Sequence, residues 1–311
     1  MSPLPVEPAW RLAERAEEQS WLITGLWSEQ AVGIVGGEPK CCKSFLALDL
    51  AVAVASGTPC LRRFAVSRAG RVLLFAAEDA LHIVRRRLEG IATAAGVALA
   101  DLDIQVITAP TVRLDLDADR KNLAETVARL QPRLLILDPF VRLHRIDENA
   151  SGEVAPLLAY LRELQRRHGM AVLVVHHARK GGSARAGQAL RGSSEFHAWG
   201  DSNLYLRRDA DTLTLTVEHR AAPSPRPITI ELAQRGLALA LEVAERSEPV
   251  APTPTTLDDR IITALADRPL PFLELRALCR VRAATLHERI GVLTAAGRVE
   301  KIDGTYHLAG R

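Results

Sequence analysis

Short apolar runs alternate with longer amphipathic segments over residues 31–175 of the chain. The apolar runs have the length of β-strands and little internal alternation, which is typical of strands buried on both faces. The segments between them space their apolar residues about 3.6 positions apart, as helices do. Strands are predicted at 31–35, 71–75, 104–107, 134–137 and 171–175, and helices at 43–56, 82–95, 121–131 and 153–168. Repeated strand–helix–strand units predict an α/β fold with a mostly parallel sheet.

The pattern changes after Gly200, where polar and apolar residues alternate over short distances. This alternation predicts antiparallel strands that extend the sheet, at 203–207, 212–217, 228–232 and 237–243. Three prolines and the lack of any helical or strand period then predict a stiff linker. The predicted organisation is an N-terminal helical segment (1–22), a core domain (23–244), a linker (245–256) and a small C-terminal domain (257–311). The amphipathic helix expected within 8–20 packs either on its own domain or on a neighbouring subunit.

The C-terminal domain shows three helical periods, at 257–266, 273–279 and 283–296, followed by two short strands around Asp303-Gly304. Asp-Gly favours a type I′ hairpin, so the pattern predicts a winged helix-turn-helix. Arg282, Thr285 and Arg289 on the third helix are the candidates for DNA contact. Residues 257–311 carry nine Lys or Arg against seven Asp or Glu, which is a faint positive excess. DNA binding and protein docking therefore both stay open for this domain.

Composition narrows the class of protein. The chain has 311 residues, of which 48% are hydrophobic and 25% charged, as in globular proteins that bury a core. A net charge of +3 is too small to attract DNA or anionic lipid to the whole protein surface, so any such contact is local. No signal peptide is found, and the apolar runs are well short of the about 20 residues of a membrane span. Four cysteines without a C-x-x-C spacing fit a reducing cytoplasm.

A glycine-rich turn joins the first predicted strand to the first predicted helix. It matches the phosphate loop G-x-x-x-x-G-K-[ST] at all but one position, because Cys42 stands where the second glycine belongs. Loop amides and the helix N-terminus would face the phosphates of ATP, Lys43 would add positive charge, and the Ser44 hydroxyl would reach Mg²⁺. The predicted nucleotide-binding residues are Gly37, Glu38, Pro39, Lys40, Cys41, Cys42, Lys43, Ser44 and Phe45.

Cys42 admits three interpretations. A Cβ at this position can crowd the phosphate, because a glycine normally allows the close approach of the backbone. The loop then either widens slightly and still binds ATP, or it weakens hydrolysis, or the thiol has a redox role. The redox interpretation ranks last, since a disulfide between the adjacent Cys41 and Cys42 would be strained.

Three further polar residues follow predicted strands. Asp138 ends the strand at 134–137 and is placed as a Walker B carboxylate that holds Mg²⁺, although an ordinary capping aspartate would show the same pattern. Glu78 follows the strand at 71–75, and His177 follows the strand at 171–175. Carboxyl ends of parallel strands share one edge of a sheet, so these groups are expected to converge with Lys43. His176 is interpreted as a structural histidine.

The motifs occur in a characteristic order: Gly37-Glu-Pro-Lys-x-x-Lys-Ser, Ala77-Glu-Asp, Leu137-Asp-Pro, Asp147-Glu-Asn149, Val175-His-His-Ala-Arg-Lys180 and Leu190-Arg-Gly-Ser-Ser194. Together they resemble the RecA-type ATPases of the RepA-like hexameric replicative helicase group, over about residues 20–245. The resemblance implies a RecA-like P-loop core that assembles into a homo-oligomeric, hexameric ring, hydrolyses ATP between subunits with Mg²⁺, and acts on DNA.

The resemblance also implies roles for single residues. Lys43 and Ser44 hold the phosphates and Mg²⁺, Asp138 is the Mg²⁺ carboxylate, and Glu78 activates the attacking water. His177 is the sensor of the γ-phosphate, and Lys180–Gln188, with Lys180 and Arg185, is the candidate DNA loop. Arg220 is the candidate arginine finger, with Arg191 as a second candidate, while Glu218 stands where a lysine is expected.

Two hypotheses of function follow from these expectations. The first is a ring-forming DNA motor or DNA-remodelling ATPase in replication or mobile-element DNA metabolism. The second is a nucleotide-switched DNA-binding regulator with weak or no hydrolysis. Glu78, Asp138 and Arg220 favour the motor, whereas Cys42 and Glu218 favour the switch.

Overall fold

A computed structural model describes residues 6–11, 21–177, 195–209, 212–236, 238–244, 257–279 and 281–309. The chain divides into two units, Met1–Ala244 and Glu245–Arg311, and each is described by itself. The predicted linker and the candidate residues Lys180, Arg185 and Arg191 lie outside the described residues. Within the described parts, no helix is long and apolar enough to cross a bilayer.

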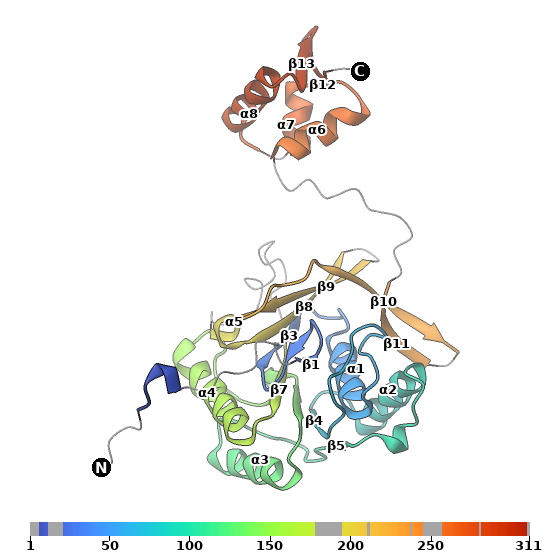
Figure 1. Ribbon diagram of the computed structural model, residues 1–311, viewed down its shortest axis with the longest axis vertical. Coiled ribbons are helices and arrows are strands. Elements are labelled where there is room, and N and C mark those ends of the chain that lie inside the picture. Colours follow the sequence, from blue (N-terminus) through green and yellow to red (C-terminus); the bar gives the residue numbers. More distant parts are fainter. Residues whose placement is uncertain are drawn as a thin grey trace. The chain divides into compact units, whose positions relative to one another are not determined.

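One sheet organises the first unit (Figure 1). In spatial order its described strands are β11 (Ala238–Val243), β10 (Ile228–Arg235), β9 (Thr212–His219), β8 (Ser202–Asp209), β3 (Val32–Gly37), β7 (Ala171–His177), β6 (Leu134–Asp138), β4 (Val72–Ala76) and β5 (Ile104–Val106). The strands from β8 to β5 pair in parallel, and β9, β10 and β11 continue the sheet antiparallel. The predicted α/β class with a mostly parallel sheet and an antiparallel extension is therefore the observed one.

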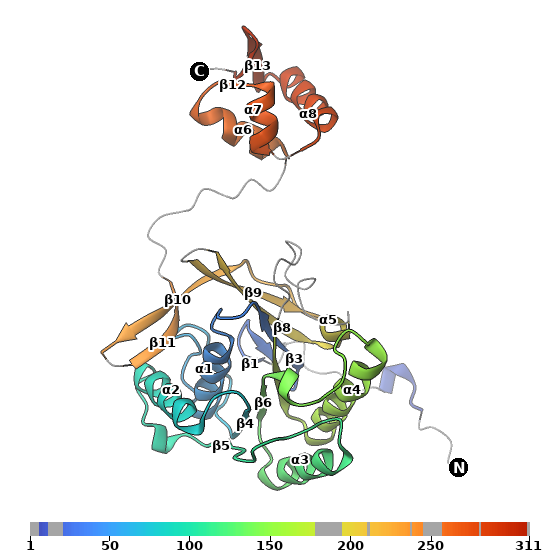
Figure 2. The same ribbon diagram turned by 180° about the vertical axis from the view of Figure 1, so that it is seen from behind.

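Helices cover both faces of the sheet, which is why its central strands carry almost unbroken apolar runs. On one face α1 (Lys43–Ser56) and α2 (Leu81–Ala94) pack against alternate strand residues such as Leu74 and Ile136. On the other face α3 (Asp117–Leu130), α4 (Ser151–His168) and α5 (Glu195–Trp199) pack against residues such as Leu73 and Leu135 (Figure 2). The two cores meet only through the sheet, so the strand order decides which loops become neighbours.

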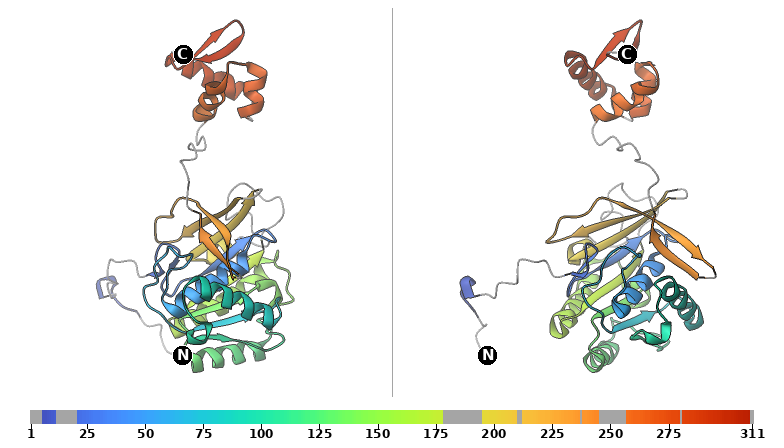
Figure 3. Two further views of the ribbon diagram at one scale, coloured as in Figure 1. Left: turned by 90° about the vertical axis from the view of Figure 1, so that its right-hand side faces the viewer. Right: turned by 45° about the vertical axis from the view of Figure 1, so that its right-hand side comes forward.

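The antiparallel strands β10 and β11 lie against the helices of the first face (Figure 3). A Cβ placed on Gly90 of α2 would lie 3.4 Å from the backbone nitrogen of Leu239 in β11, an ordinary van der Waals distance, so the helix and the strand lie close together there.

Several short elements have no counterpart in the sequence prediction. They are the hairpin of β1 (Trp21–Ile23) and β2 (Trp27–Ser28), the helix α5, and the 3-10 turns η1 (Ala9–Arg11), η2 (Leu99–Asp101) and η3 (Phe140–Arg142). Of the helix expected within 8–20, the structure describes only η1 and the residue before it. Several strands also run further than predicted, among them β6 through Asp138 and β7 through His177, because backbone pairing continues past the apolar run.

The second unit contains α6 (Leu257–Asp267), β12 (Leu270–Pro271), α7 (Phe272–Cys279), α8 (Ala283–Ala295), β13 (Val299–Ile302) and β14 (Thr305–Leu308). Its helices and its sheet, ordered β12-β14-β13, enclose a small core that includes Leu275 and Leu286. Asp303 and Gly304 join β13 to β14 with φ of 46° and 84°, the left-handed values that a type I′ turn requires.

Gly33 lies where β3 and β8 approach each other closely, at the centre of the sheet. A Cβ there would lie 1.7 Å from the Ser202 carbonyl oxygen, so the backbone of β3 or β8 would have to move. We expect Gly33→Ala to lower the free energy of unfolding by about 3 kcal/mol or more. Urea titration followed by tryptophan fluorescence measures this, since all four tryptophans lie in the first unit.

Gly152→Ala is the matched control, because a Cβ at this exposed position of α4 meets nothing within 4 Å. It should leave stability unchanged or raise it by up to about 1 kcal/mol. Equal effects of the two substitutions would contradict the packing described for β3.

Candidate functional site

The turn between β3 and α1 has the backbone of a phosphate loop. β3 is buried along its whole length, and α1 begins at Lys43 directly after the turn. Gly37, Lys40 and Cys42 have φ of 154°, 65° and 62°. These positive values curl the loop around the N-terminus of α1, where backbone N–H groups lack partners within the helix and can bind an anion.

Cys42 adopts the backbone conformation of the glycine that it replaces. It is the residue before α1, with φ of 62° and ψ of 25°, a left-handed conformation that costs a residue with a Cβ about 1–2 kcal/mol. The loop thus keeps its path and carries a half-buried thiol at its tightest point.

Lys43 and Cys41 hold the loop together from inside. The Lys43 ammonium donates to the Glu38 carbonyl oxygen at 2.7 Å and lies 3.9 Å from the Cys41 sulfur. The Cys41 thiol donates to the same carbonyl at 2.8 Å. Burial lowers the pKa of Lys43, with Cys41 and Asp138 opposing the shift, and burial raises the pKa of Cys41. Cys41 is buried, and buried structural thiols are generally less reactive than exposed ones.

Asp138 and Glu78 reach the same edge of the sheet from neighbouring strands. β4 and β6 pair in parallel with Ala76 opposite Asp138, and the Ala77 N–H donates to the Asp138 carbonyl oxygen at 2.7 Å. Asp138 is only 8% exposed, and burial raises its pKa to about 6. A hydrogen bond with Ser44 opposes this shift, while Asp79 and Glu78 add to it. The site holds negative charge that a cation would stabilise.

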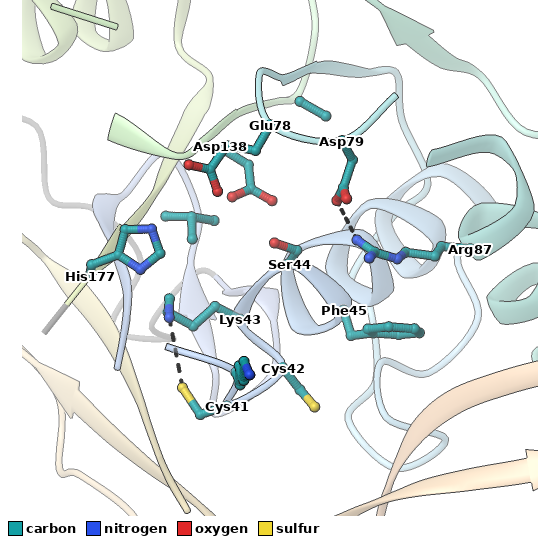
Figure 4. Close-up of a pocket in the computed structure, with 13 residues that line it drawn as sticks. Cys41, Cys42, Lys43, Ser44, Phe45, Glu78, Asp79, Arg87, Asp138 and His177 are labelled. Atoms are coloured by element: carbon teal, nitrogen blue, oxygen red, sulfur yellow. Dashed lines mark hydrogen bonds and ion pairs between the residues drawn. The ribbon is translucent and has the colours of Figure 1, made fainter. Parts of the chain in front are cut away.

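The two histidines at the end of β7 lie in different surroundings. His177 stands opposite Gly37 in the parallel ladder and lines the pocket in front of Lys43 (Figure 4). His176 is 1% exposed and stacks on Phe196 with ring centroids 4.1 Å apart. His177 therefore faces the loop, and His176 packs in the core of the other face.

These groups surround one pocket of about 320 Å³. Its lining includes Lys40, Cys41, Cys42, Lys43, Ser44, Phe45, Glu78, Asp79, Arg87, Asp138 and His177. The pocket is of a size that ligand sites commonly have, and it combines a cationic loop with a group of carboxylates. Such a site suits a polyphosphate together with a divalent cation.

Residues 2–183 match a family of AAA domains. The chain belongs to this family. The match includes the loop, both carboxylates and His177, whereas β8 to β11 lie beyond it.

Two solved structures share the fold of this AAA domain. The RadB recombinase is 18% identical, over 70% of this chain and 92% of that chain, with a TM-score of 0.51. A DnaB-like replicative helicase is 11% identical, over 68% of this chain and 57% of that chain, with a TM-score of 0.53. The expected RecA-like architecture of the core is thereby confirmed.

Three contacts around the pocket of the AAA domain involve residues that sequence patterns did not single out. Arg142 in η3 forms an ion pair with Glu78, with 3.0 Å between Nε and Oε1. Arg87 of α2 pairs with Asp79 and lies over the Phe45 ring, 5.2 Å from its centroid. Arg87 follows two other arginines, and Arg142 lies in a short 3-10 turn, so no motif spacing distinguishes either of them.

His144 and Glu148 form a buried contact in the segment between η3 and α4. His144 Nε2 is 3.3 Å from Glu148 Oε1, and the two side chains are 2% and 15% exposed. The hydrogen bond with His144 and the charges of His176, His144 and His177 lower the pKa of Glu148 against the effect of its burial. The Asp147-Glu-Asn149 motif is the sequence signal of this pair, although the motif alone does not identify its partners.

Arg220 lies at the other end of the sheet from the pocket. Its N–H donates to the Asp201 carbonyl oxygen at 2.9 Å, just before β8 begins, while the phosphate loop follows the end of the parallel strand β3. Six strand residues separate the two ends by about 20 Å. The guanidinium pairs with Asp201 and donates to the Ala198 carbonyl, and Glu218 pairs with His197 at 2.9 Å. The structure does not bring Arg220 to the nucleotide pocket of its own subunit.

The candidate DNA-contacting residues of the second unit divide into two kinds. Arg282 and Thr285 are exposed at the start of α8. Arg289 is half-buried and forms a two-pronged ion pair with Asp258 of α6, at 2.8 and 2.5 Å. The pKa of Asp258 is lowered and that of Arg289 raised by this hydrogen-bonded pair. Arg289 thus has a structural partner, and Arg282 and Thr285 remain the better candidates.

The raised pKa of Asp138 predicts how the free energy of unfolding changes with pH. Its folded-state pKa of about 6 exceeds the ordinary 3.8, so above pH 6 its buried charge lowers the free energy of unfolding, by about 1–3 kcal/mol. This penalty disappears as the pH falls from 6 to below 4, where both states are protonated. Without nucleotide or Mg²⁺, Asp138→Asn should therefore stabilise the protein at pH 8 and change it little at pH 4, in urea titrations at each pH.

Asp101→Asn is the control, because this side chain is exposed. A stabilisation by Asp138→Asn that is equal at the two pH values would contradict the assignment to a buried charge.

Proposed function

We propose that this chain is an ATPase that assembles into a hexameric ring and acts on DNA in replication or in mobile-element DNA metabolism. One observation carries the proposal: Lys43 and Ser44 of α1, Glu78 after β4, Asp138 of β6 and His177 of β7 line a single pocket at the carboxyl edge of the sheet. Membership in the AAA domain family supports ATP as the ligand of that pocket.

The residues present suit ATP with Mg²⁺. Backbone N–H groups of the loop and the Lys43 ammonium would hold the phosphates, and Ser44 and Asp138 would hold the metal ion. Mg²⁺ prefers oxygen ligands of this kind, and its charge would offset the buried charge that raises the pKa of Asp138 to about 6. When bound, the ion neutralises charge that develops on the transferred phosphoryl group.

Glu78 is the proposed base for the attacking water. Its carboxylate is 43% exposed, lines the pocket and lies on the same rim as Asp138. The ion pair with Arg142, with 3.0 Å between Nε and Oε1, orients this carboxylate, and a carboxylate is the form that accepts a proton. His177 lines the pocket and precedes the candidate DNA loop at 180–188, and it is the proposed sensor of the γ-phosphate.

Arg220 supports the proposed ring. It is about 20 Å from the phosphate loop of its own chain and 54% exposed, so it can serve as a finger only for the nucleotide of a neighbouring subunit. Its present partners, Asp201 and the Ala198 carbonyl, would release it when that neighbour is bound.

Three arguments support the proposal that this chain acts on DNA. The two similar structures are described as a recombinase and a replicative helicase. The candidate loop with Lys180 and Arg185 follows the sensor strand. The second unit has the three helices and the hairpin of a winged helix-turn-helix, with Arg282 and Thr285 exposed on α8. Docking of a partner protein is the alternative for that unit.

A nucleotide-switched regulator with weak hydrolysis is the second candidate function. Cys42 places a thiol where the loop meets the phosphates, and Glu218 pairs with His197 where the family resemblance expects a cation. The Cys42 side chain reduces the room for the phosphates in the transition state, and Glu218 stands in place of a positive charge that would stabilise it.

Two substitutions separate binding from turnover. Lys43→Ala should abolish ATP binding in calorimetry, because it removes the buried cation of the loop. Glu78→Gln should keep ATP binding and lower the steady-state turnover about 100-fold or more, because it removes the proton acceptor. Normal turnover by Glu78→Gln would refute the assigned base.

Single-stranded DNA distinguishes the two functions. A motor should hydrolyse ATP faster when DNA is added to the wild-type chain, and a switch should not. Uptake of neither ATP nor ADP in the presence of Mg²⁺ would overturn both.

Mixing two inactive variants tests the cross-subunit finger. Lys43→Ala keeps Arg220 but loses its own site, and Arg220→Ala keeps its site but loses the finger. Mixed rings contain interfaces in which an intact site faces an intact finger, so mixing should restore ATPase activity that neither variant has alone. No recovery in mixtures that mass measurement shows to be mixed oligomers would contradict action between subunits.

A further inference from the structure

We infer that Arg208 is an additional phosphate-binding residue of the nucleotide site in its own subunit, held beside the phosphate loop by Cys42. The inference rests on the proposed nucleotide site and adds to it a cation that lies on β8, outside every motif described above.

Strand pairing brings Arg208 to the loop. β8 runs parallel to β3, with Leu206 opposite Gly37, the first residue of the phosphate-loop motif. The contact is tight, since a Cβ on Gly37 would lie 2.3 Å from the Leu206 carbonyl oxygen. The end of β8 is therefore fixed against the start of the loop.

The face of β8 decides which arginine reaches the loop. Leu204 and Leu206 pack in the core with α1 and α2, whereas Tyr205 packs on the other face of the sheet. Side chains alternate along a strand, so Arg208 continues the face of α1 and Arg207 continues the opposite face.

The Arg208 guanidinium contacts the loop at its tightest point. Its Nη2 lies 3.5 Å from the Cys42 sulfur. Cys42 stands where the phosphate-loop motif has a glycine, at the position where backbone and phosphate come closest. A guanidinium beside this residue is within reach of a phosphate seated in the loop, and its planar donors suit phosphate oxygens.

Its surroundings leave the charge of Arg208 available. A thiol is a weak acceptor and does not neutralise a guanidinium. Among the described residues, no carboxylate forms an ion pair with Arg208, in contrast to Arg87 and Arg142, which pair with the pocket carboxylates Asp79 and Glu78. A cation in this position is satisfied by an anionic ligand. Cys42 thus acquires a function: its side chain holds the arginine next to the loop.

Calorimetry with Arg208→Ala tests the inference, with Arg207→Ala as the matched control of equal charge change on the opposite face. With Mg²⁺, Arg208→Ala should weaken ATP binding about tenfold relative to Arg207→Ala, because a charge-assisted hydrogen bond is lost. Arg208→Lys should recover part of the affinity. The loss should be smaller for AMP than for ATP, and it should shrink at high salt. Thermal unfolding followed by tryptophan fluorescence verifies that the variants are folded.

The outcomes separate this inference from the proposed function. Equal ATP affinities of Arg208→Ala and Arg207→Ala, in a protein whose Lys43→Ala variant no longer binds, would overturn the role of Arg208 alone. Unchanged ATP affinity with slower turnover would overturn it too, because Arg208 would then act only in hydrolysis or on a neighbouring subunit. A wild-type chain that binds no nucleotide would overturn both.

Discussion

The parallel pairing of β8, β3, β7, β6 and β4 is the constraint on which the candidate site depends. Backbone hydrogen bonds between these strands set the register of their carboxyl ends, and helices on both faces exclude water from the strands. Within that register Gly37 lies opposite His177 on one side and Leu206 on the other, and Ala76 lies opposite Asp138. The loops that follow these residues therefore begin side by side along the carboxyl edge of the sheet. Lys43, Glu78, Asp138 and His177 meet because their strands end together, and no long-range contact among the side chains is required to assemble them.

The same constraint accounts for the electrostatics of the pocket. A strand that is buried to its last residue carries Asp138 into a place where only 8% of it is exposed, and burial raises the pKa of its carboxyl to about 6. Lys43 is buried beside it, with its pKa lowered. Each group is destabilised by lost hydration, and the ammonium is occupied by the Glu38 carbonyl. A triphosphate with a divalent cation would supply the missing partner to both. Burial thus places opposite charges together in one pocket, as is common where a site is built for a charged ligand.

Much of this architecture could be predicted from the sequence, and the parts that could not were missed for separate physical reasons. Unbroken apolar runs identified the central strands, and the helix at 43–56 has the predicted bounds because the phosphate loop precedes it and Gly57, in a left-handed conformation, ends it. The small β1–β2 hairpin was missed because strands of two or three residues show no period. Arg208 was missed because sequence patterns reveal strands but not their order, and only the order makes β8 the neighbour of β3. Arg142 and Arg87 were missed because no motif spacing links them to their partners Glu78 and Asp79.

Cys42 shows how a local exception can be consistent with the whole fold. The left-handed backbone at this position lies directly before α1, in a loop whose first residue, Gly37, closely approaches β8. Glycine would adopt it without strain, and cysteine adopts it at a cost of about 1–2 kcal/mol. That cost is tolerated where the side chain makes a contact that glycine lacks, and the Cys42 sulfur contacts Arg208 at 3.5 Å. The thiol and the arginine are therefore best understood as a pair. Cys42 departs from the motif, and the side chain that it adds contacts a cation from β8. This contact keeps positive charge beside the phosphate loop.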